Sequence, residues 1–413
     1  MKLAYITARM PFAFAEQFFE PEIDSLAETF ELTLIPTRAT RRENRYPRLH
    51  ATPHFLALFD ARVARLALAE FRRSPGAALA ALRTLAFGRC ALRARAVNLV
   101  LFPKALALAA EVRRLGIEHM HVNWMTSSAT IAYVASRLTG IPFSITAHQH
   151  DIFYDNLTRE KVRRAEFVRV ISARNCRHLQ ALLPPELRAK CRVVHLGVRL
   201  PAAPLAAPER LPRILCAARM CEWKGHRFLL RALAELRDAG VAFTCDLAGD
   251  GEIQAAVAQQ IVELRLGERV QMLGNVPHAA LVASLERGDY DVFALASTER
   301  DGEHEGIPVA LMEAMAVRMP VVATRTGSIA ELVDDESGLL VPQADPRALA
   351  VALQRLLGDP ALRSRLGEHG RKRVIANFST TQTSRDLSEL LLAAAPWHQH
   401  RNAAPDEGRK SLC

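Results

Sequence analysis

Short apolar segments alternate with amphipathic segments along this chain, and that alternation constrains the fold more than any other feature. Lys2–Thr7 and Glu31–Pro36 have the composition of buried strands. Ile117–Asn123 is expected to be a strand, Ser128–Leu138 a helix and Phe143–Thr146 the next strand. Strand–helix–strand order makes successive strands parallel and covers both faces of the sheet with helices. The first half therefore predicts a doubly wound α/β domain.

The same pattern restarts after a proline-rich stretch. Residues 199–211 carry three prolines and several alanines, which is typical of an extended linker. Beyond it, Arg213–Ala217 and Phe243–Ala248 are expected to be strands and His226–Asp238 an amphipathic helix. A chain of 413 residues suits two domains of about 200 residues each.

We therefore expect two Rossmann-like domains that face a central cleft, with ligands at the carboxyl ends of the strands. The N-terminal domain would span residues 1–198 and the C-terminal domain residues 212–395, joined by the linker 199–211. The last helix could return to the N-terminal domain. Residues 396–413 show no periodicity and are expected to form a disordered tail.

Positive charge is concentrated between Arg38 and Arg114. That segment holds sixteen Lys and Arg residues against four Asp and Glu, whereas the whole chain has a net charge of +10. Much of it, from about Pro53 to Ala96, has helical apolar spacing interrupted at Ser74-Pro75-Gly76. Such a basic field fits either an anionic partner, such as the inner surface of a membrane, or arginines that solvate helices. Aromatic residues are sparse among these cations, so no nucleic acid is expected as a partner.

Other features predict a cytoplasmic protein. Binding of its basic segment to lipid would place it on the inner face of the plasma membrane. The seven cysteines are scattered and form no Cys-x-x-Cys pair, which argues against a disulfide framework or a zinc site. The first residues lack a signal-peptide pattern. The best apolar run, Ala96–Ala110, is broken by Pro103 and Lys104 and is too short to span a bilayer.

The segment DGEHEGIPVALMEAMAVRMPVV carries the most chemical information. Glu305 and Glu313 stand eight residues apart in it. A proline suits the first position of a helix, and a helix start presents free N–H groups and a positive dipole end that suit a phosphate. The residues expected at this helix start are Gly306, Ile307, Pro308 and Val309.

Each glutamate then has a predicted partner in a bound nucleotide sugar. Glu313 lies among apolar residues, so its carboxylate is costly to bury without donors, and a ribose diol supplies two. Glu305 precedes the helix and would reach hydroxyls of the donor sugar. The alternative, a capping glutamate and a solvated surface glutamate, does not account for the glycine and the proline.

Two cations follow the first strand of the second half. Arg219 and Lys224 in AARMCEWKGH would lie over the same ligand and stabilise charge on a leaving nucleoside diphosphate. Surface arginines and lysines are common, so this pair gains its meaning from the glutamate pair.

Histidines follow strands in the first half. His148 and His150 alternate in ITAHQHDIF, and His119 and His121 have the same spacing on the preceding strand. These histidines could be metal ligands or structural residues whose ring nitrogens are hydrogen-bonded within the protein. Alternatively, one of them could donate a hydrogen bond to the reacting sugar. No further Asp or His set completes a metal site, so metal binding ranks last. Asp289-Tyr290-Asp291 is formally an Asp-x-Asp metal motif, but it leads directly into an apolar strand and is interpreted as a turn and strand cap.

With these residues in place, the chain resembles glycosyltransferase family 4, and within it the colanic acid and exopolysaccharide biosynthesis transferases. DGEHEGIPVALMEAMA with PVVATRTGSIAELV is similar to that subgroup almost residue for residue, and Glu305 and Glu313 match the family's E-x7-E motif. The resemblance implies the GT-B fold and a retaining transferase that needs no metal or other cofactor. Its donor would be a UDP- or GDP-sugar and its acceptor a glycan or a lipid-linked sugar.

The resemblance also implies roles for individual residues. Catalytic roles fall on His148, Arg219, Lys224 and Glu305. The donor nucleotide sugar would additionally contact Gly249, Asp250, Gly251, Val276, Gly306, Ile307, Pro308, Val309 and Glu313. Glu16 and Asp151 would line the acceptor side. The chain departs from the family in lacking a Gly-Gly pair in its first loop and in carrying Asn123-Trp124 where the subgroup often has His-Phe.

Three alternatives belong to other classes. A basic protein that binds membrane or nucleic acid without catalysis would give the two glutamates no role. A nucleotide-sugar epimerase would share the fold, and a phosphorylase would need a pyridoxal-phosphate lysine that the motifs do not indicate.

Overall fold

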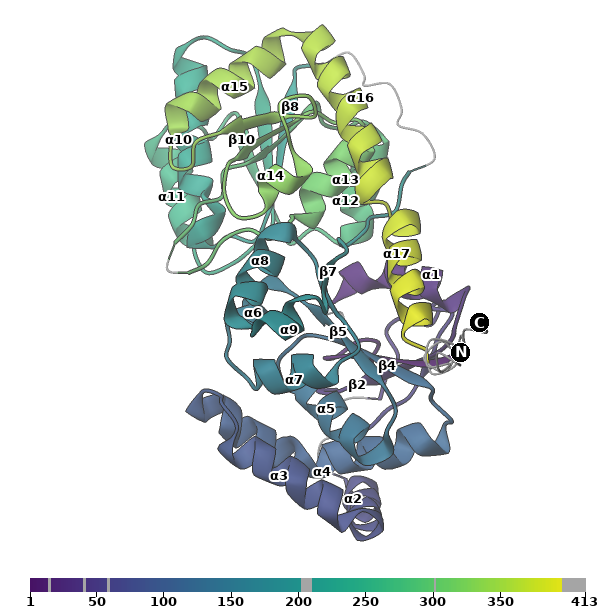
Figure 1. Cartoon of the computed structure of the whole chain (residues 1–413). Coiled ribbons are helices and arrows are strands. Elements are labelled where there is room, and N and C mark those ends of the chain that lie inside the picture. Colours follow the sequence, from purple (N-terminus) through teal and green to yellow (C-terminus); the bar gives the residue numbers. More distant parts are fainter. Residues whose placement is uncertain (14–15, 40–41, 58–59, 202–209, 301, 396–413) are drawn as a thin grey trace, which may run out of the picture. The chain divides into compact units, whose positions relative to one another are not determined.

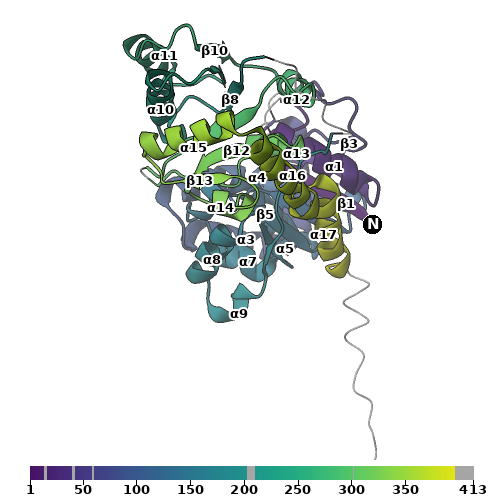
Figure 2. The ribbon, with the colours of Figure 1, turned by 90° about the horizontal axis from the view of Figure 1, so that it is seen from above.

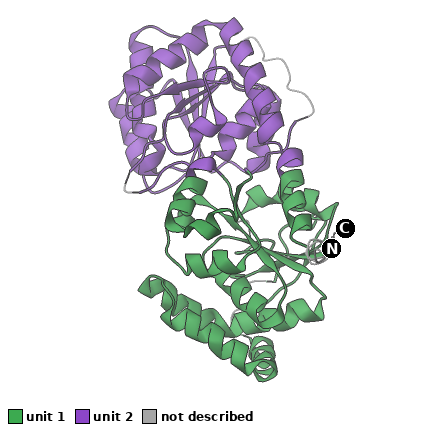
Figure 3. Cartoon of the chain, in the orientation of Figure 1, with its two compact units in different colours: residues 1–171, 175–194, 384–413 green, residues 172–174, 195–383 purple. Residues whose placement is uncertain are grey.

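The computed structural model describes residues 1–13, 16–39, 42–57, 60–201, 210–300 and 302–395. Two compact units divide the chain (Figure 3). Unit 1 contains residues 1–171, 175–194 and, at its C-terminal end, the segment from Ser384; unit 2 contains residues 172–174 and 195–383. Most of the expected linker and the whole expected tail lie outside the described residues.

Unit 1 is built on a seven-stranded parallel sheet with the strand order β3-β2-β1-β4-β5-β6-β7 (Figure 1). Its strands are β1 (Lys2–Thr7), β2 (Glu31–Pro36), β3 (Thr52–Pro53), β4 (His119–Asn123), β5 (Phe143–Ala147), β6 (Val168–Val170) and β7 (Cys191–Val193). Its helices are α1 (Glu20–Ala27), α2 (Ala61–Arg73), α3 (Pro75–Phe87), α4 (Leu92–Arg114), α5 (Ser127–Thr139), α6 (Gln149–Ile152), α7 (Thr158–Arg164), α8 (Ala173–Leu182, which starts in unit 2) and α9 (Pro185–Arg188), with a 3-10 turn at Gln17–Phe19.

Unit 2 has a six-stranded parallel sheet with the order β10-β9-β8-β11-β12-β13. The strands are β8 (Arg213–Ala217), β9 (Thr244–Ala248), β10 (Val270–Gly274), β11 (Val292–Leu295), β12 (Val321–Thr324) and β13 (Leu339–Val341). The helices are α10 (His226–Asp238), α11 (Gln254–Glu263), α12 (His278–Glu286), α13 (Val309–Ala316), α14 (Ile329–Leu332), α15 (Pro346–Gly358) and α16 (Pro360–Asn377), with a 3-10 turn at Glu222–Lys224. The last helix, α17 (Thr380–Ala393), begins in unit 2 and belongs to unit 1 from Ser384 onward. The expected class of two doubly wound α/β domains is confirmed.

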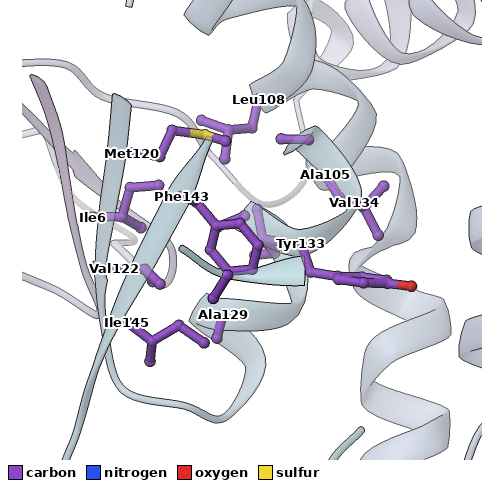
Figure 4. Close-up of a cluster of buried hydrophobic side chains, with 14 of the residues drawn as sticks. Ile6, Ala105, Leu108, Met120, Val122, Ala129, Tyr133, Val134, Phe143 and Ile145 are labelled. Atoms are coloured by element: carbon purple, nitrogen blue, oxygen red, sulfur yellow. The ribbon is translucent and has the colours of Figure 1, made fainter. Parts of the chain in front are cut away.

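The core of unit 1 lies between its sheet and helices α4 and α5. Phe143 of β5 is fully buried at the centre of this cluster, next to Met120 of β4, Leu108 of α4 and Ala129 of α5 (Figure 4). Burial of a phenylalanine side chain stabilises a fold by about 2–3 kcal/mol. Helix α4 is therefore a core element of the unit.

Helix α4 contains the apolar run 96–110. The helix continues through Pro103, and the Lys104 side chain is buried. The Lys104 ammonium donates to the Thr37 carbonyl at 2.8 Å and to the Leu56 carbonyl at 2.6 Å. The predicted helical stretch from Pro53 began too early, since α2 starts at Ala61. Within the described residues, no helix has the length and apolarity that crossing a membrane requires.

Both faces of the unit 2 sheet are covered. Ile214 and Cys216 of β8 belong to one buried cluster, and Leu215, between them, belongs to another. The first cluster includes residues of α10 and α15, which pack against each other (Figure 2). Alternate strand residues point to opposite faces, so a strand buried on both faces is apolar throughout, as β8 is after Arg213.

Candidate active site

Strand order brings together the two most informative motifs of unit 2. The order reverses between the adjacent strands β8 and β11, and ligands in open parallel sheets bind beyond the strand ends at such a reversal. Lys224 follows β8 and Glu305 follows β11. Lys224 Nζ lies 2.5 Å from Glu305 Oε1, with the two side chains only 15% and 5% exposed.

Other groups hold this pair in place. The Ser297 hydroxyl donates to the same Glu305 oxygen at 2.6 Å. The Lys224 ammonium also lies 4.3 Å from the centre of the Trp223 ring, at cation–π distance. Glu305 is thus a buried, charge-paired carboxylate at the strand ends, although Lys224 and Glu305 are separated by 81 positions in the sequence.

Two glycines shape the loops beside the pair because a side chain would collide with neighbouring backbone. Gly225 has a φ of +69°, and a Cβ there would come within 1.9 Å of the Ala296 carbonyl oxygen. Gly249, with a φ of +141°, would place a Cβ 2.1 Å from the Ala218 oxygen. The loops after β8 and β9 therefore pack backbone against backbone, and the Met220 N–H donates to the Asp250 carbonyl at 2.6 Å.

The predicted phosphate-binding helix is α13, with one correction. Pro308 is the N-cap, with extended backbone, and the first helical residue is Val309, so the proline stands one position before the place we expected. Ile307, Val309 and Val276 are partly buried against the same apolar cluster beneath the helix. Gly306 directly precedes Ile307 and is half-buried.

Glu313 has a partner that the sequence did not indicate. His278, the first residue of α12, places Nε2 2.6 Å from Glu313 Oε1, and the Glu313 side chain is 13% exposed. Histidines are common and 35 positions separate the two residues, so only the contact between α12 and α13 reveals the pair.

Arg219, the other predicted cation, is exposed. A hydrogen bond to Cys221 raises the pKa of its guanidinium, as does the negative charge of Glu252 and Glu303. It therefore remains charged and lies on the loop after β8, as does Lys224. The structure does not bring its side chain into contact with Glu305 or Glu313, so a shared ligand stays a prediction.

Asp289-Tyr290-Asp291 is engaged within the protein. Arg287 donates to Asp289 at 2.5 Å, and Asp291 accepts from the Arg213 N–H at 2.7 Å. The Tyr290 hydroxyl donates to Asp246 at 2.9 Å. These contacts support the interpretation as a turn and strand cap. Across the described ranges, no group of three or more His, Cys, Asp and Glu residues could hold a metal ion.

In unit 1, the strand order reverses between β1 and β4, and the loops after these strands contain the predicted acceptor-side residue Glu16. Its carboxylate accepts from the backbone N–H groups of Ala8, Arg9 and Met10, at 3.1, 2.7 and 3.1 Å. It also accepts from the Trp124 indole N–H. Glu16 thus closes its own loop, and its oxygens are already occupied by four donors.

His148 follows β5 at the same sheet edge. Its ring centre lies 4.2 Å from that of Trp124, and its Nε2 is buried without a hydrogen-bond partner. Burial, with the nearby charge of Arg169, lowers the pKa of His148 to about 3, so the imidazole is neutral at ordinary pH. A neutral, unpartnered imidazole can donate or accept one hydrogen bond to a substrate hydroxyl.

Asp151 fastens the loop that carries Trp124. Its Oδ2 accepts from the Met125 N–H at 2.6 Å, and the buried Lys161 ammonium donates to the Met125 carbonyl at 2.7 Å. Burial raises the pKa of Asp151 to about 7 and lowers that of Lys161 to about 7. Asp151 is therefore placed behind the loop and positions it.

The strand histidines bind hydroxyl groups. The Ser144 hydroxyl lies 2.8 Å from both His119 Nε2 and His121 Nδ1, and the Thr146 hydroxyl lies 2.8 Å from His121 Nε2. These contacts favour the structural interpretation over metal ligation.

Two parallel sheets of this kind, each with helices on both faces, match the GT-B fold of solved glycosyltransferase structures. Residues 202–373 match the family described as glycosyl transferases group 1. This part of the chain is therefore similar to a glycosyltransferase group 1 domain.

Relatives agree with this class, and solved structures agree with the fold. The WcaL protein of Escherichia coli (strain K12), named for glycosyl transfer in colanic acid biosynthesis, is 39% identical over 215 residues, covering 50% of this chain and 52% of that protein. The amylovoran biosynthesis glycosyltransferase AmsK of Erwinia amylovora is 36% identical over 181 residues, covering 43% and 44%. The chain spans about half the length of the curated relatives it matches. The structure of Anabaena Alr3699/HepE in complex with UDP superimposes with a TM-score of 0.70 at 18% identity, covering 95% of this chain and 100% of that one.

Proposed function

We propose that this protein is a retaining glycosyltransferase that moves a sugar from a UDP- or GDP-sugar to a glycan or lipid-linked acceptor. The observation that carries the proposal is the contact between Lys224 and Glu305 at the strand reversal of unit 2. A cation and a carboxylate that converge there can serve the two halves of a nucleotide sugar, the diphosphate and the hydroxyls. The relatives named for polymer biosynthesis support a role in exopolysaccharide or cell-envelope polysaccharide synthesis.

In this proposal unit 2 holds the donor. Lys224, Arg219 and the free N–H groups at the start of α13 stabilise the charge that develops on the leaving diphosphate. Glu305 accepts from hydroxyls of the sugar, and Glu313 accepts from the ribose diol. Lys224 pairs with Glu305 when no nucleotide sugar is bound. The diphosphate must therefore compete with the Glu305 carboxylate for this cation as it binds.

Unit 1 contributes His148 and binds the acceptor. The neutral imidazole orients the transferring sugar by one hydrogen bond. The bond from the anomeric carbon to the diphosphate breaks, the acceptor oxygen attacks from the side of departure, and the leaving phosphate takes the acceptor's proton. The configuration at the anomeric carbon is then retained. The cations neutralise the leaving group, so the reaction needs neither a metal nor another cofactor.

The proposed location is the cytoplasm, on the inner face of the plasma membrane, where nucleotide sugars and lipid-linked acceptors meet. The excess of arginines between Arg38 and Arg114 supports attraction to an anionic surface. Flotation with anionic vesicles at low and high salt tests this part, and absence of binding at low salt would remove it.

The donor is tested by thermal-shift measurements of the full chain with UDP, GDP and their sugars, with and without EDTA. We expect stabilisation by one nucleotide family, unaffected by EDTA and lost in Glu313→Ala. Arg355→Ala, which changes an exposed residue in the last turn of α15, is the control. No stabilisation by any nucleoside diphosphate would contradict the proposal and favour a basic protein without catalysis.

A further inference from the structure

Unit 1 contains a hollow of about 700 Å³ beside helix α4 that the proposed chemistry does not use. Its lining includes Arg38, Arg93, Val97, Val100, Ser127 and Tyr154. All of these residues belong to unit 1, the unit proposed to bind the acceptor.

One wall of the hollow is apolar and open to water. Arg93, Val97 and Val100 follow one another at helical spacing along α4, so they share one face of the helix. Val97 is 40% exposed and Val100 is 55% exposed, and Tyr154 opposite them is 36% exposed. The other side of α4 is buried in the core through residues such as Leu108. This wall therefore offers hydrocarbon contact to a ligand.

The other end of the hollow is polar and cationic. The Arg38 guanidinium donates to the Ser127 hydroxyl, and Arg93 is an exposed cation in the lining of the same hollow. Ser127 is the first residue of α5, a helix whose N-cap makes no side-chain hydrogen bond, and a helix N-terminus favours an anion. Among the residues that the structure describes, those that line the hollow include no Asp or Glu. This end is therefore complementary to a negatively charged group.

The polar end lies at the edge of the sheet where the proposed chemistry occurs. Arg38 follows β2 and Ser127 follows β4, so both stand at the carboxyl ends of strands. Trp124, in the same loop as Ser127, contacts His148. A group attached to an anion at Ser127 can thus extend along this edge toward His148, while a hydrocarbon chain on its other side follows α4.

We propose that this hollow binds the junction between phosphate and hydrocarbon in a lipid-linked acceptor. Arg38, Arg93 and Ser127 hold the phosphate, and Val97, Val100 and Tyr154 contact the chain. The ligand is an anionic amphiphile with a long prenyl or alkyl chain. Its role as acceptor rests on the proposed glycosyltransferase function, whereas its binding does not.

The experiment uses the full chain and farnesyl phosphate, measured by isothermal titration calorimetry. Inorganic phosphate and farnesol are the probes that carry only one half of the amphiphile. We expect farnesyl phosphate to bind at least tenfold more tightly than either, and Val100→Glu and Arg93→Gln each to weaken it at least tenfold. Because Val100 and Arg93 are exposed, both variants should fold, as checked by circular dichroism.

Matched controls come from helix α3, outside the hollow. Leu79, which is 54% exposed, and the exposed Arg83 supply Leu79→Glu and Arg83→Gln, which should change the affinity less than twofold. Equal losses in the α3 and α4 variants would show binding to the whole basic surface, as a bulk membrane would bind, and would overturn the proposal. So would binding of farnesol or inorganic phosphate as tight as that of farnesyl phosphate, or unchanged binding by Val100→Glu.

Failure here and failure of the proposed function have different signatures. Stabilisation by a nucleoside diphosphate, together with unchanged farnesyl phosphate binding in Val100→Glu, removes the amphiphile site and leaves the transferase proposal standing. If Val100→Glu abolishes farnesyl phosphate binding and no nucleotide binds, the amphiphile site stands and the transferase proposal is removed.

Discussion

Replacement of Lys224 by methionine removes the positive charge of the central ion pair and keeps most of the side-chain volume. Glu305 would keep the Ser297 hydroxyl as a donor but lose the ammonium 2.5 Å from its carboxylate. Glu305 is 5% exposed, so water solvates the carboxylate poorly in place of the lost partner. Loss of one partner from a buried pair costs about 3–5 kcal/mol, and the remaining hydroxyl places the expected loss near 3 kcal/mol.

A double-mutant cycle separates stability from catalysis. Glu305→Gln combined with Lys224→Met removes both charges, so we expect the double variant to be more stable than the sum of the two losses predicts, by about 2 kcal/mol. The assay is urea unfolding followed by circular dichroism and tryptophan fluorescence. Transfer should behave differently, since loss of a group that stabilises the leaving charge lowers kcat by about 10²–10³-fold and a second neutral substitution does not restore it.

The results that refute this reasoning are specific. A loss in Lys224→Met below about 0.5 kcal/mol, typical of a surface ion pair, would show that the pair is solvated in solution. Near-normal turnover in Lys224→Met would remove the cation from the mechanism. Recovery of turnover in the double variant would mean that the single variant fails only because it is unstable.

Two further predictions concern each unit separately. Burial lowers the pKa of His119 and of His148 to about 3. Below pH 6.5 the unfolded chain therefore binds protons that the native state excludes. Each histidine should then lower the free energy of unfolding by about 1.4 kcal/mol per pH unit as the pH falls toward 3. Urea titrations at pH 7, 6 and 5 check this, and His148→Gln should reduce the slope by one histidine's share, whereas an unchanged slope would contradict it. In unit 2, Gly225→Ala should destabilise by more than about 2 kcal/mol because its Cβ meets a carbonyl oxygen, while Gly240→Ala, with a φ of +72° and open space around it, should cost only about 1 kcal/mol. Equal thermal shifts for the two alanine variants would show that the loop after β8 yields to the added methyl group.

Much of the fold was predictable because it depends on local periodicity. The bounds of β1, β2, β8 and α10 agree with the expected segments, since each is an apolar run or an amphipathic repeat bounded by turn residues. The start of α2 and the single helix α4 were not anticipated. Pro103 and Lys104 argue against a helix locally, and only the carbonyls of Thr37 and Leu56, distant in sequence, satisfy the buried ammonium.

The site divides in the same way. The sequence by itself predicted which residues carry the chemistry, namely the glutamate pair and the two cations. Only the tertiary structure decided their partners, such as Lys224 with Glu305, His278 with Glu313 and Glu16 with Trp124. These contacts follow from strand neighbours, β8 beside β11 and β1 beside β4, and from helix packing. Residue periodicity tells a strand from a helix but carries no information about which parallel strands lie side by side.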